Sequence, residues 1–261
     1  MKKYIDLHAH PFKEYFEFPE SIIEESYDMG VGKIFIVGTS LEDSREVKSL
    51  SSKYGFTFPI IGIHPNNAKD KLHLDTLRTL VDSSIVGIGE IGLDFHYENS
   101  PSFEQQQIFF RYQIELANEF NIPIIVHTRD ATQETYDILK AYKSKNKDMK
   151  IIIHSYSSGP DWVQKFLDIG AYLSFSGVAT FKNAKDVQDS IIITPIDKLF
   201  YETDTPYLAP MPMRGKINVP HYAIHTAKFI ANLKGVTVDF LNEQVNKNIF
   251  TIFNICGDKN E

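Results

Sequence analysis

Short apolar, β-branched segments alternate with longer segments of helical periodicity along the chain. The apolar segments lie at residues 4–7, 33–37, 57–63, 85–88, 122–126, 150–153, 171–175 and 198–201. Segments with helical spacing lie near 20–29, 42–54, 73–82, 101–120, 130–142, 160–169, 184–190 and 220–255, the last long enough for more than one helix. Near-continuous apolar strands that alternate with helices are typical of parallel sheets whose faces helices cover.

Eight such alternations favour closure into a (β/α)8 TIM barrel of the α/β class. No repeat, low-complexity tract or flexible linker marks a boundary, so we predict a single domain over residues 1–261. An open doubly wound sheet is the alternative, but no Gly-rich phosphate turn follows the first apolar segment. Within the pattern, Ser100, Pro101 and Glu104 predict a capped helix start, and Asn121 before Pro123 predicts that helix's end.

Ionisable side chains that can bind metals follow most of the apolar segments. Five of the nine histidines lie at, or two residues past, a segment end, namely His8, His10, His64, His127 and His154. Carboxylates occupy similar places at Glu90, Glu202 and Asp204. In a (β/α)8 barrel the strand ends form the ring where active sites lie, so we expect these side chains to converge.

This set of imidazoles and carboxylates has the composition of a metal site. His8 and His10 stand two residues apart on an extended segment and therefore point to one face. Without thiolates, the set suits Zn²⁺, Mn²⁺, Fe²⁺ or Mg²⁺. It exceeds what one tetrahedral ion needs, and indicates two ions about 3.5–4 Å apart that share Glu90. A bridging water ionises near neutral pH, so a metal-bridging hydroxide would hydrolyse an ester, an amide or a phosphodiester.

Charge and composition limit the classes of partner. The net charge of −7 argues against a protein that coats duplex DNA through a basic surface, but not against an enzyme whose ions receive one strand end. Cys256 is the single cysteine, which fits a reducing compartment. No segment has the pattern of a signal peptide or the roughly 18 apolar residues of a membrane span. We therefore expect a cytoplasmic monomer.

Six motifs follow one another from residue 5 to about 220: His8-Ala9-His10, Gly62-Ile63-His64-Pro65, Gly89-Glu90-Ile91-Gly92-Leu93-Asp94, Val126-His127-Thr128-Arg129-Asp130-Ala131, His154-Ser155-Tyr156-Ser157-Ser158-Gly159 and Glu202-Thr203-Asp204-Thr205-Pro206-Tyr207-Leu208. Together they resemble the TatD family of metal-dependent DNases, within the amidohydrolase superfamily. A further motif, Arg214-Gly215-Lys216-Ile217-Asn218, resembles the family's Arg-Gly-x-x-Asn loop, although Val219-Pro220 follows where the family usually has Glu-Pro.

The resemblance implies a somewhat distorted TIM barrel with two divalent ions, Mg²⁺, Mn²⁺ or Zn²⁺. One ion would bind His8, His10, Glu90 and Asp204, and the other would bind Glu90, His127 and His154. His64 would face the substrate phosphate or leaving group, and Asp204 would accept a proton from the attacking water.

The resemblance also implies the substrate. Family members are described as DNases or 3′–5′ exonucleases that often act on single strands, so the expected partner is DNA with a single-stranded or frayed 3′ end. The candidate phosphate contacts are Arg129, Lys182, Arg214 and Lys216. A base could stack on an aromatic residue in a loop after a strand, namely Phe95, Tyr97, Tyr156, Phe181 or Tyr207.

Two alternatives remain. A binuclear amidohydrolase for a small ester, lactone or amide could use the same barrel, since fold does not determine substrate. Many such enzymes bridge their metals with a carboxylated lysine, whereas here the strand carries Glu90, which favours the nuclease. An inactive, metal-stabilised interaction protein would be expected to have a broken ligand set, but every ligand position is filled.

Overall fold

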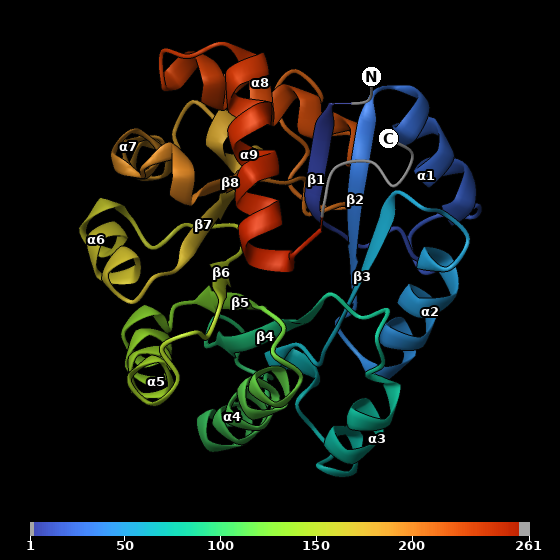
Figure 1. Cartoon of the computed structure of the whole chain (residues 1–261), viewed down its shortest axis with the longest axis vertical. Coiled ribbons are helices and arrows are strands. Elements are labelled where there is room, and N and C mark those ends of the chain that lie inside the picture. Colours follow the sequence, from blue (N-terminus) through green and yellow to red (C-terminus); the bar gives the residue numbers. More distant parts are fainter. Residues whose placement is uncertain (1–2, 256–261) are drawn as a thin grey trace.

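Eight parallel strands form one sheet in sequence order, as shown in Figure 1. This computed structural model describes residues 3–255, so Cys256 and both ends of the predicted domain lie outside the described residues. Each strand pairs in parallel with the next. The strands are β1 (Tyr4–Ala9), β2 (Val31–Val37), β3 (Thr57–Ile61), β4 (Gly87–Asp94), β5 (Ile124–Arg129), β6 (Ile151–Ile153), β7 (Tyr172–Phe175) and β8 (Leu199–Tyr201).

The first and last strands meet through the residues that follow β8. Ala9 and Thr205 form an isolated parallel bridge, and the His10 backbone N–H donates to the Thr205 carbonyl at 2.8 Å. Behind this seam the buried carboxylate of Asp6 accepts hydrogen bonds from the backbone N–H (2.8 Å) and the hydroxyl (2.5 Å) of Thr203. The sheet therefore closes into the predicted (β/α)8 barrel and is not an open doubly wound sheet.

The barrel is somewhat distorted, as expected. The pairing register of β1 against β2 shifts between Tyr4 and Ile5, and again between Asp6 and Ala9, the part of β1 that carries His8. The register of β4 against β5 also shifts. This shift lies between Ile88 and Ile91, the part of β4 that carries Glu90. Two of these three shifts therefore lie where the strands carry predicted metal ligands, His8 and Glu90.

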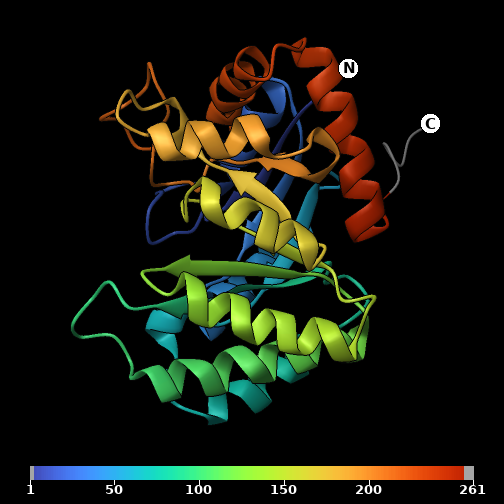
Figure 2. The same cartoon turned by 90° about the vertical axis from the view of Figure 1, so that its left-hand side faces the viewer.

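Helices surround the barrel and cover its strands (Figures 1 and 2). They are α1 (Pro19–Asp28), α2 (Leu41–Ser51), α3 (Leu72–Leu80), α4 (Phe103–Phe120), α5 (Thr132–Lys145), α6 (Pro160–Asp168), α7 (Lys185–Ile193), α8 (Ala223–Leu233) and α9 (Val238–Phe253). Between the barrel and these helices lies a continuous core rich in fully buried isoleucines, each of which stabilises the fold by about 1.5–3 kcal/mol. Among the described residues, no helix is both long and apolar enough to cross a membrane.

The start of α4 differs from the prediction. Ser102, rather than Ser100, is the N-cap, and its hydroxyl accepts a hydrogen bond from the Gln105 backbone N–H at 3.3 Å. Ser100 instead donates its hydroxyl hydrogen to the side-chain oxygen of Asn66, in the segment after β3. The predicted end is correct, since Asn121 caps the helix in a left-handed conformation with φ of 53°.

The strand that carries Glu90 is longer than predicted. Residues 85–88 were expected to end just before Glu90, but β4 runs from Gly87 to Asp94, so Glu90 lies inside the strand. His8 and His127 also lie within β1 and β5. A charged residue normally ends a buried strand, but these groups neutralise and hydrogen-bond one another inside the barrel.

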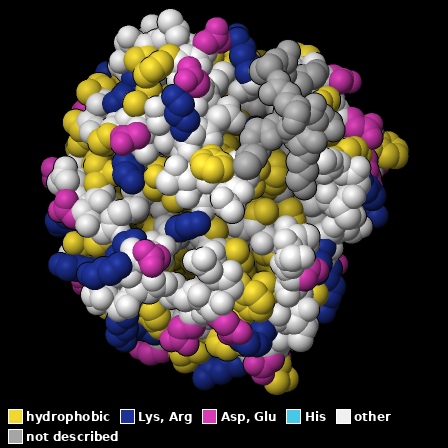
Figure 3. Space-filling model, viewed as in Figure 1, with side chains coloured by type: hydrophobic (Ala, Val, Ile, Leu, Met, Phe, Trp, Pro, Cys, Tyr) yellow, Lys and Arg dark blue, Asp and Glu magenta, His cyan; other side chains and the backbone are white. Residues whose placement is uncertain are grey.

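The two ends of the barrel differ in character. Helix α9 lies across the end where the strands begin, and Asn248 on it donates to the Leu199 and Ile196 carbonyls. The loops that follow the strands project from the opposite end, as the direction of β5 in Figure 2 shows. On the α9 face, acidic and basic side chains are interspersed without a region of one sign (Figure 3).

Gly92 allows β4 and β5 to approach each other beside the predicted ligands. Its φ of +145° suits glycine, and an added Cβ would lie 1.9 Å from the carbonyl oxygen of His127, the residue with which it pairs. No side chain can be accommodated there without moving the backbone that carries His127.

Gly92→Ala should therefore lower the free energy of unfolding by about 2–4 kcal/mol in denaturant titrations. Gly55→Ala is the matched control, because no atom lies within 4 Å of a Cβ built at Gly55. The control should change stability by no more than about 0.5 kcal/mol. Equal effects of the two substitutions would show that the β4–β5 approach is not constrained at Gly92.

Candidate metal centre

The predicted metal ligands meet in a cavity at the carboxyl ends of the strands. The cavity has a volume of about 620 Å³, and its lining includes His10, His64, Glu90, His127, His154 and Asp204. His8 is fully buried directly behind it. Side chains from positions 8 to 204 are thus brought together by the parallel strands, as expected for a barrel of this type.

Glu90 lies at the centre of this cluster and is only 4% exposed. Its two carboxylate oxygens face different sets of imidazoles. Oε1 faces His127 Nδ1 at 2.8 Å, His154 Nε2 at 3.2 Å and His64 Nε2 at 3.5 Å. Oε2 faces His8 Nε2 at 3.4 Å and His10 Nε2 at 3.7 Å. One carboxylate therefore connects two groups of potential ligands.

The first group consists of His8, His10 and Asp204. The Nε2 atoms of the two histidines lie 3.1 Å apart, and His10 Nε2 lies 3.5 Å from Asp204 Oδ1. The other ring nitrogen of His10, Nδ1, bonds to the Val37 carbonyl at 2.6 Å. Since a carbonyl only accepts, Nδ1 carries a proton there, and in the neutral ring Nε2 has a free lone pair directed at the group. The i, i+2 convergence predicted for His8 and His10 is confirmed.

Carboxylates outside the cluster orient the histidines of the second group. Glu202 Oε1 lies 2.8 Å from His154 Nδ1, and Asp94 Oδ2 lies 2.9 Å from His127 Nε2. In both rings the other nitrogen faces Glu90. A carboxylate behind a histidine is the usual way in which proteins orient a metal-binding imidazole and raise its basicity.

Burial and charge set the protonation of the cluster. Burial favours the neutral form of Glu90 and alone would raise its pKa. The charge of His154 and the hydrogen bond from His127 together outweigh burial and hold that pKa well below its usual range. For His154, burial acts to lower the pKa, but Glu90 and Glu202 outweigh it and raise the pKa well above 6.5. The cluster without a metal is thus a set of ionised carboxylates that hold protons on neighbouring imidazoles.

The chemistry of these donors fits divalent cations. Among the described residues, three groups bring their ligand atoms within 4.8 Å of one another, namely His8–His10–Asp204, His8–His154–Glu202 and His64–Glu90–His127. Within residues 3–255, His8 Nδ1 is also buried without a hydrogen-bond partner. A cation would satisfy the facing nitrogens of His8 and His10 together with the carboxylates, and would replace the protons that now separate them.

His64 differs from the other histidines, although its distances alone would admit it as a ligand. Its Nδ1 accepts a hydrogen bond from the Asn66 backbone N–H at 3.2 Å. Burial lowers the pKa of His64 to about 3, so the ring is neutral. The single proton must therefore be on Nε2, the atom that faces the cavity. An Nε2–H group cannot bind a metal, but it can donate a hydrogen bond to a substrate oxygen.

The predicted substrate contacts divide into two sets. Arg129 lines the cavity; its guanidinium lies 5.2 Å from the centre of the Tyr97 ring and donates to the Tyr97 hydroxyl. Tyr156 is 2% exposed and donates its hydroxyl hydrogen to the Gly159 carbonyl, so the cavity meets little of its ring. Arg214 and Lys216 are exposed on the loop after β8 and do not line the cavity.

Some contributors to the site have roles that the sequence analysis did not predict. Asp94 and Glu202 stand in motifs but act behind histidines, and a carboxylate four residues after Glu90 or two before Asp204 is the signal that could have identified them. Tyr15 and Tyr207, from opposite ends of the chain, both line the cavity, and their hydroxyls lie 2.8 Å apart. No sequence pattern indicates this pairing.

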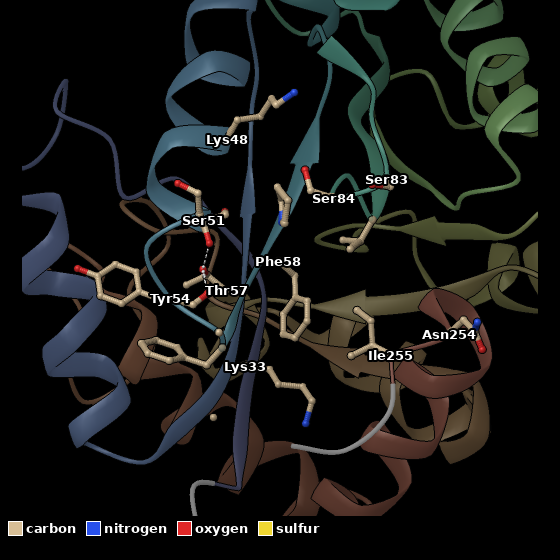
Figure 4. A pocket seen from close by; sticks show the side chains of 16 residues that line it. Lys33, Lys48, Ser51, Tyr54, Thr57, Phe58, Ser83, Ser84, Asn254 and Ile255 are labelled. Atoms are coloured by element: carbon tan, nitrogen blue, oxygen red, sulfur yellow. Dashed lines mark hydrogen bonds between the residues drawn. The ribbon is translucent and has the colours of Figure 1, made fainter. Parts of the chain in front are cut away.

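A second cavity, of about 550 Å³, lies at the end of the barrel where β2 and β3 begin (Figure 4). Aromatic side chains and serines line it, but among the described residues no histidine or carboxylate does. Its lysines are engaged: Lys33 donates to Asn246, and Lys48 donates to Asp82 and the Leu80 carbonyl. It offers no metal-binding or acid–base chemistry, so the histidine-lined cavity is the candidate site.

Known proteins resemble the chain over nearly its whole length. Residues 5–254 match the family described as TatD related DNase, which confirms the resemblance seen in the motifs. The metal-dependent hydrolase YcfH of Escherichia coli K12 is 33% identical over 98% of this chain and 97% of its own. The metal-dependent hydrolase YabD of Bacillus subtilis is 35% identical over 96% of this chain and 98% of its own.

Solved structures also resemble this chain in fold. The TatD homologue YjjV of Escherichia coli K12 superimposes with a TM-score of 0.90 at 26% identity, covering 98% of this chain and 99% of its own. A dihydroorotase from Campylobacter jejuni, at 15% identity and a TM-score of 0.62, covering 99% of this chain and 85% of its own, shares the fold alone.

Metal binding at this cluster should release protons and strengthen as pH rises. Burial acts to lower the pKa of His10, but its hydrogen bond with Asp204 outweighs burial and raises that pKa. Hydrogen bonds with Asp94 and Glu90 raise the pKa of His127 in the same way. The pKa of His154 is raised further. Below these raised values a cation must displace bound protons, and above them it need not. Affinity should therefore rise with pH above 6.5 and then level off.

Calorimetric titration with Zn²⁺ or Mn²⁺ in buffers of different ionisation enthalpy measures the proton release. Glu202→Gln is the informative variant, because it removes one of the two carboxylates that hold the proton on His154, and it should reduce the number of protons released. Affinity that is independent of pH between 6 and 8, with no proton release, would contradict this account of the cluster.

Proposed function

The chain belongs to the TatD-related DNase family of metal-dependent hydrolases, and from this premise we propose that it hydrolyses DNA phosphodiester bonds. The proposed activity is that of a 3′–5′ exonuclease that acts on single strands or frayed 3′ ends. The observation that carries the proposal is the position of Glu90, which faces two groups of metal-binding side chains at the base of one cavity.

Two divalent ions, Mg²⁺, Mn²⁺ or Zn²⁺, would occupy these groups. His8, His10, Glu90 and Asp204 would hold one ion. Glu90, His127 and His154 would hold the other, and Glu90 would be shared through its two oxygens. When bound, such ions lower the pKa of water and neutralise charge on the phosphate. This assignment is supported by the ionised carboxylate of Glu90 and by the Nε2 of His10, which faces the cluster and has a lone pair when the ring is neutral.

The chain's own residues supply the remaining functions. Burial acts to raise the pKa of Asp204, but the hydrogen bond with His10 and the nearby histidines hold it below its usual range, so the carboxylate is ionised. Asp204 can accept a proton from the attacking water. The oxygen of that water bonds to phosphorus while the bond between phosphorus and the 3′ oxygen of the shortened strand breaks. His64 Nε2–H can donate to a phosphate oxygen, and the Arg129 guanidinium can pair with phosphate.

The shape of the cavity favours the end of a single strand. A volume of about 620 Å³ suits a ligand of nucleotide size rather than a duplex. Tyr97 and Tyr207 line the cavity and are 53% and 49% exposed, so each presents a ring on which a base can stack. Because the protein has a net charge of −7, its ions would supply positive charge for the phosphates inside the cavity.

The proposal is tested by incubating the protein with a 3′-labelled single-stranded oligonucleotide and Mg²⁺, Mn²⁺ or Zn²⁺. Shortening from the 3′ end is expected, and a chelator should abolish it. Glu90→Ala should lower the rate by about 10²–10³-fold, because it removes a ligand from both ions. Glu243→Ala, an exposed carboxylate on α9, is the control and should retain the rate.

The amidohydrolase alternative predicts a different result in the same assay. If no metal supports cleavage of DNA but the protein hydrolyses a lactone or an N-acyl amide, the nuclease proposal is wrong. A Glu90→Ala variant with the wild-type rate would instead contradict the shared-carboxylate arrangement, whichever substrate is used.

His64→Ala should separate catalysis from metal binding. Because the Nε2 of His64 carries a proton, its loss should lower kcat by about 10²-fold through a missing hydrogen bond to the substrate, with metal content unchanged. His73→Ala, on α3 and outside the cavity, is the matched control. Kinetics together with elemental analysis distinguish the roles, since loss of a metal from His64→Ala would make His64 a ligand.

A further inference from the structure

Two loops form an exposed surface beside the metal centre. They comprise residues 177–184, after β7, and residues 206–219, after β8, and both project from the carboxyl end of the barrel (Figure 2, upper left). The Arg214 guanidinium lies 4.5 Å from the centre of the Phe181 ring, and the Met211 N–H donates to the Thr180 hydroxyl at 2.8 Å. We call these two segments the outer loops.

The outer loops are basic in an acidic protein. The chain has a net charge of −7, yet residues 205–238 contain no aspartate or glutamate. Lys182, Arg214 and Lys216 are exposed, and none of the three has a carboxylate partner among the described residues. A local excess of unpaired cations attracts a polyanion.

Apolar side chains are interspersed with these cations. Met211 is 49% exposed and Ile217 is 61% exposed. Apolar surface that is rimmed by polar residues often marks an interaction site. Alternating cations and apolar surfaces are what a single nucleic-acid strand requires, since its phosphates and its unstacked bases both need partners.

The surface continues directly from the cavity and is held in place. Tyr207 and Leu208, at the start of the second outer loop, line the cavity. At the other end of that loop, Asn218 is fully buried and its side chain donates to the Thr203 carbonyl at 2.9 Å and the Tyr207 carbonyl at 2.6 Å. The loop that carries Arg214 and Lys216 is thus fastened at both ends beside Asp204 and the cavity.

We propose that the outer loops bind the part of a single DNA strand that extends beyond the nucleotides held in the cavity. This inference rests on the proposed function and assigns Arg214 and Lys216 a role outside the reaction centre. They contact phosphates several nucleotides from the cleaved bond, so they raise affinity for long strands and leave the reaction of a dinucleotide unchanged.

The test compares wild-type protein with the double variant Arg214→Ala, Lys216→Ala on a dinucleotide and on a single strand of about 12 nucleotides. For the longer strand, KM should rise about tenfold with kcat unchanged, whereas kcat/KM for the dinucleotide should stay the same. The slope of log KM against log salt should fall by about 1.4, because each of the two phosphates that these side chains neutralise accounts for about 0.7.

The control variant Lys147→Ala, Lys247→Ala makes the same change in net charge on residues outside the outer loops, and it should behave as wild type on both substrates. Thermal unfolding of all three proteins should agree, since the substituted side chains are exposed. Direct binding of the longer strand, labelled with a fluorophore, gives a readout that does not depend on turnover.

The outcomes separate this inference from the proposed function. Equal binding of the longer strand by wild type and the Arg214, Lys216 variant would overturn the inference, as would equal losses on the two substrates. Preferential binding of an acidic peptide by the same residues, without binding of the strand, would also overturn it. Absence of cleavage by wild type with any metal would count against the proposed function itself.

Discussion

The structure depends on keeping one carboxylate, Glu90, ionised inside the barrel. An isolated buried carboxylate would take up a proton, because burial disfavours its charge. Here five imidazoles surround it, and the charge of His154 and the hydrogen bonds from His127 and His154 hold its pKa well below the usual range. The imidazoles in turn need partners: Glu202 behind His154, Asp94 behind His127 and the Val37 carbonyl behind His10. The site is therefore a network in which each charge depends on several strands.

The parallel barrel makes this network possible. Six of the eight strands, or the residues directly after them, deliver one or two side chains to the same end, while α9 covers the other end. The seam between β1 and β8 matters most, because the hydrogen bonds of Thr203 to Asp6 place Asp204 next to His8 and His10. Asn218 extends the same seam to the loop with Arg214 and Lys216. Fold closure, the proposed first metal position and the outer loops thus share one set of hydrogen bonds.

The sequence predicted the fold and the convergence of the cluster, since strand-like segments and the polar residues at their ends are periodic features of the chain. It misplaced the end of β4, because a charged residue normally ends a buried strand and its neutralising partners lie far away in sequence. Three features could not be predicted. They are the positions of Asp94 and Glu202 behind histidines, the proton on His64 Nε2, and the buried hydroxyl of Tyr156. Each depends on a hydrogen bond whose direction only the folded chain determines.

The central claim is that Glu90 is shared by two ions. Anomalous diffraction from a crystal of the protein soaked with Mn²⁺ or Zn²⁺ tests it most directly. The account predicts two peaks about 3.5–4 Å apart, one beside each carboxylate oxygen of Glu90, with the first near His8, His10 and Asp204 and the second near His127 and His154. A single peak, or two peaks of which one does not contact Glu90, would contradict it.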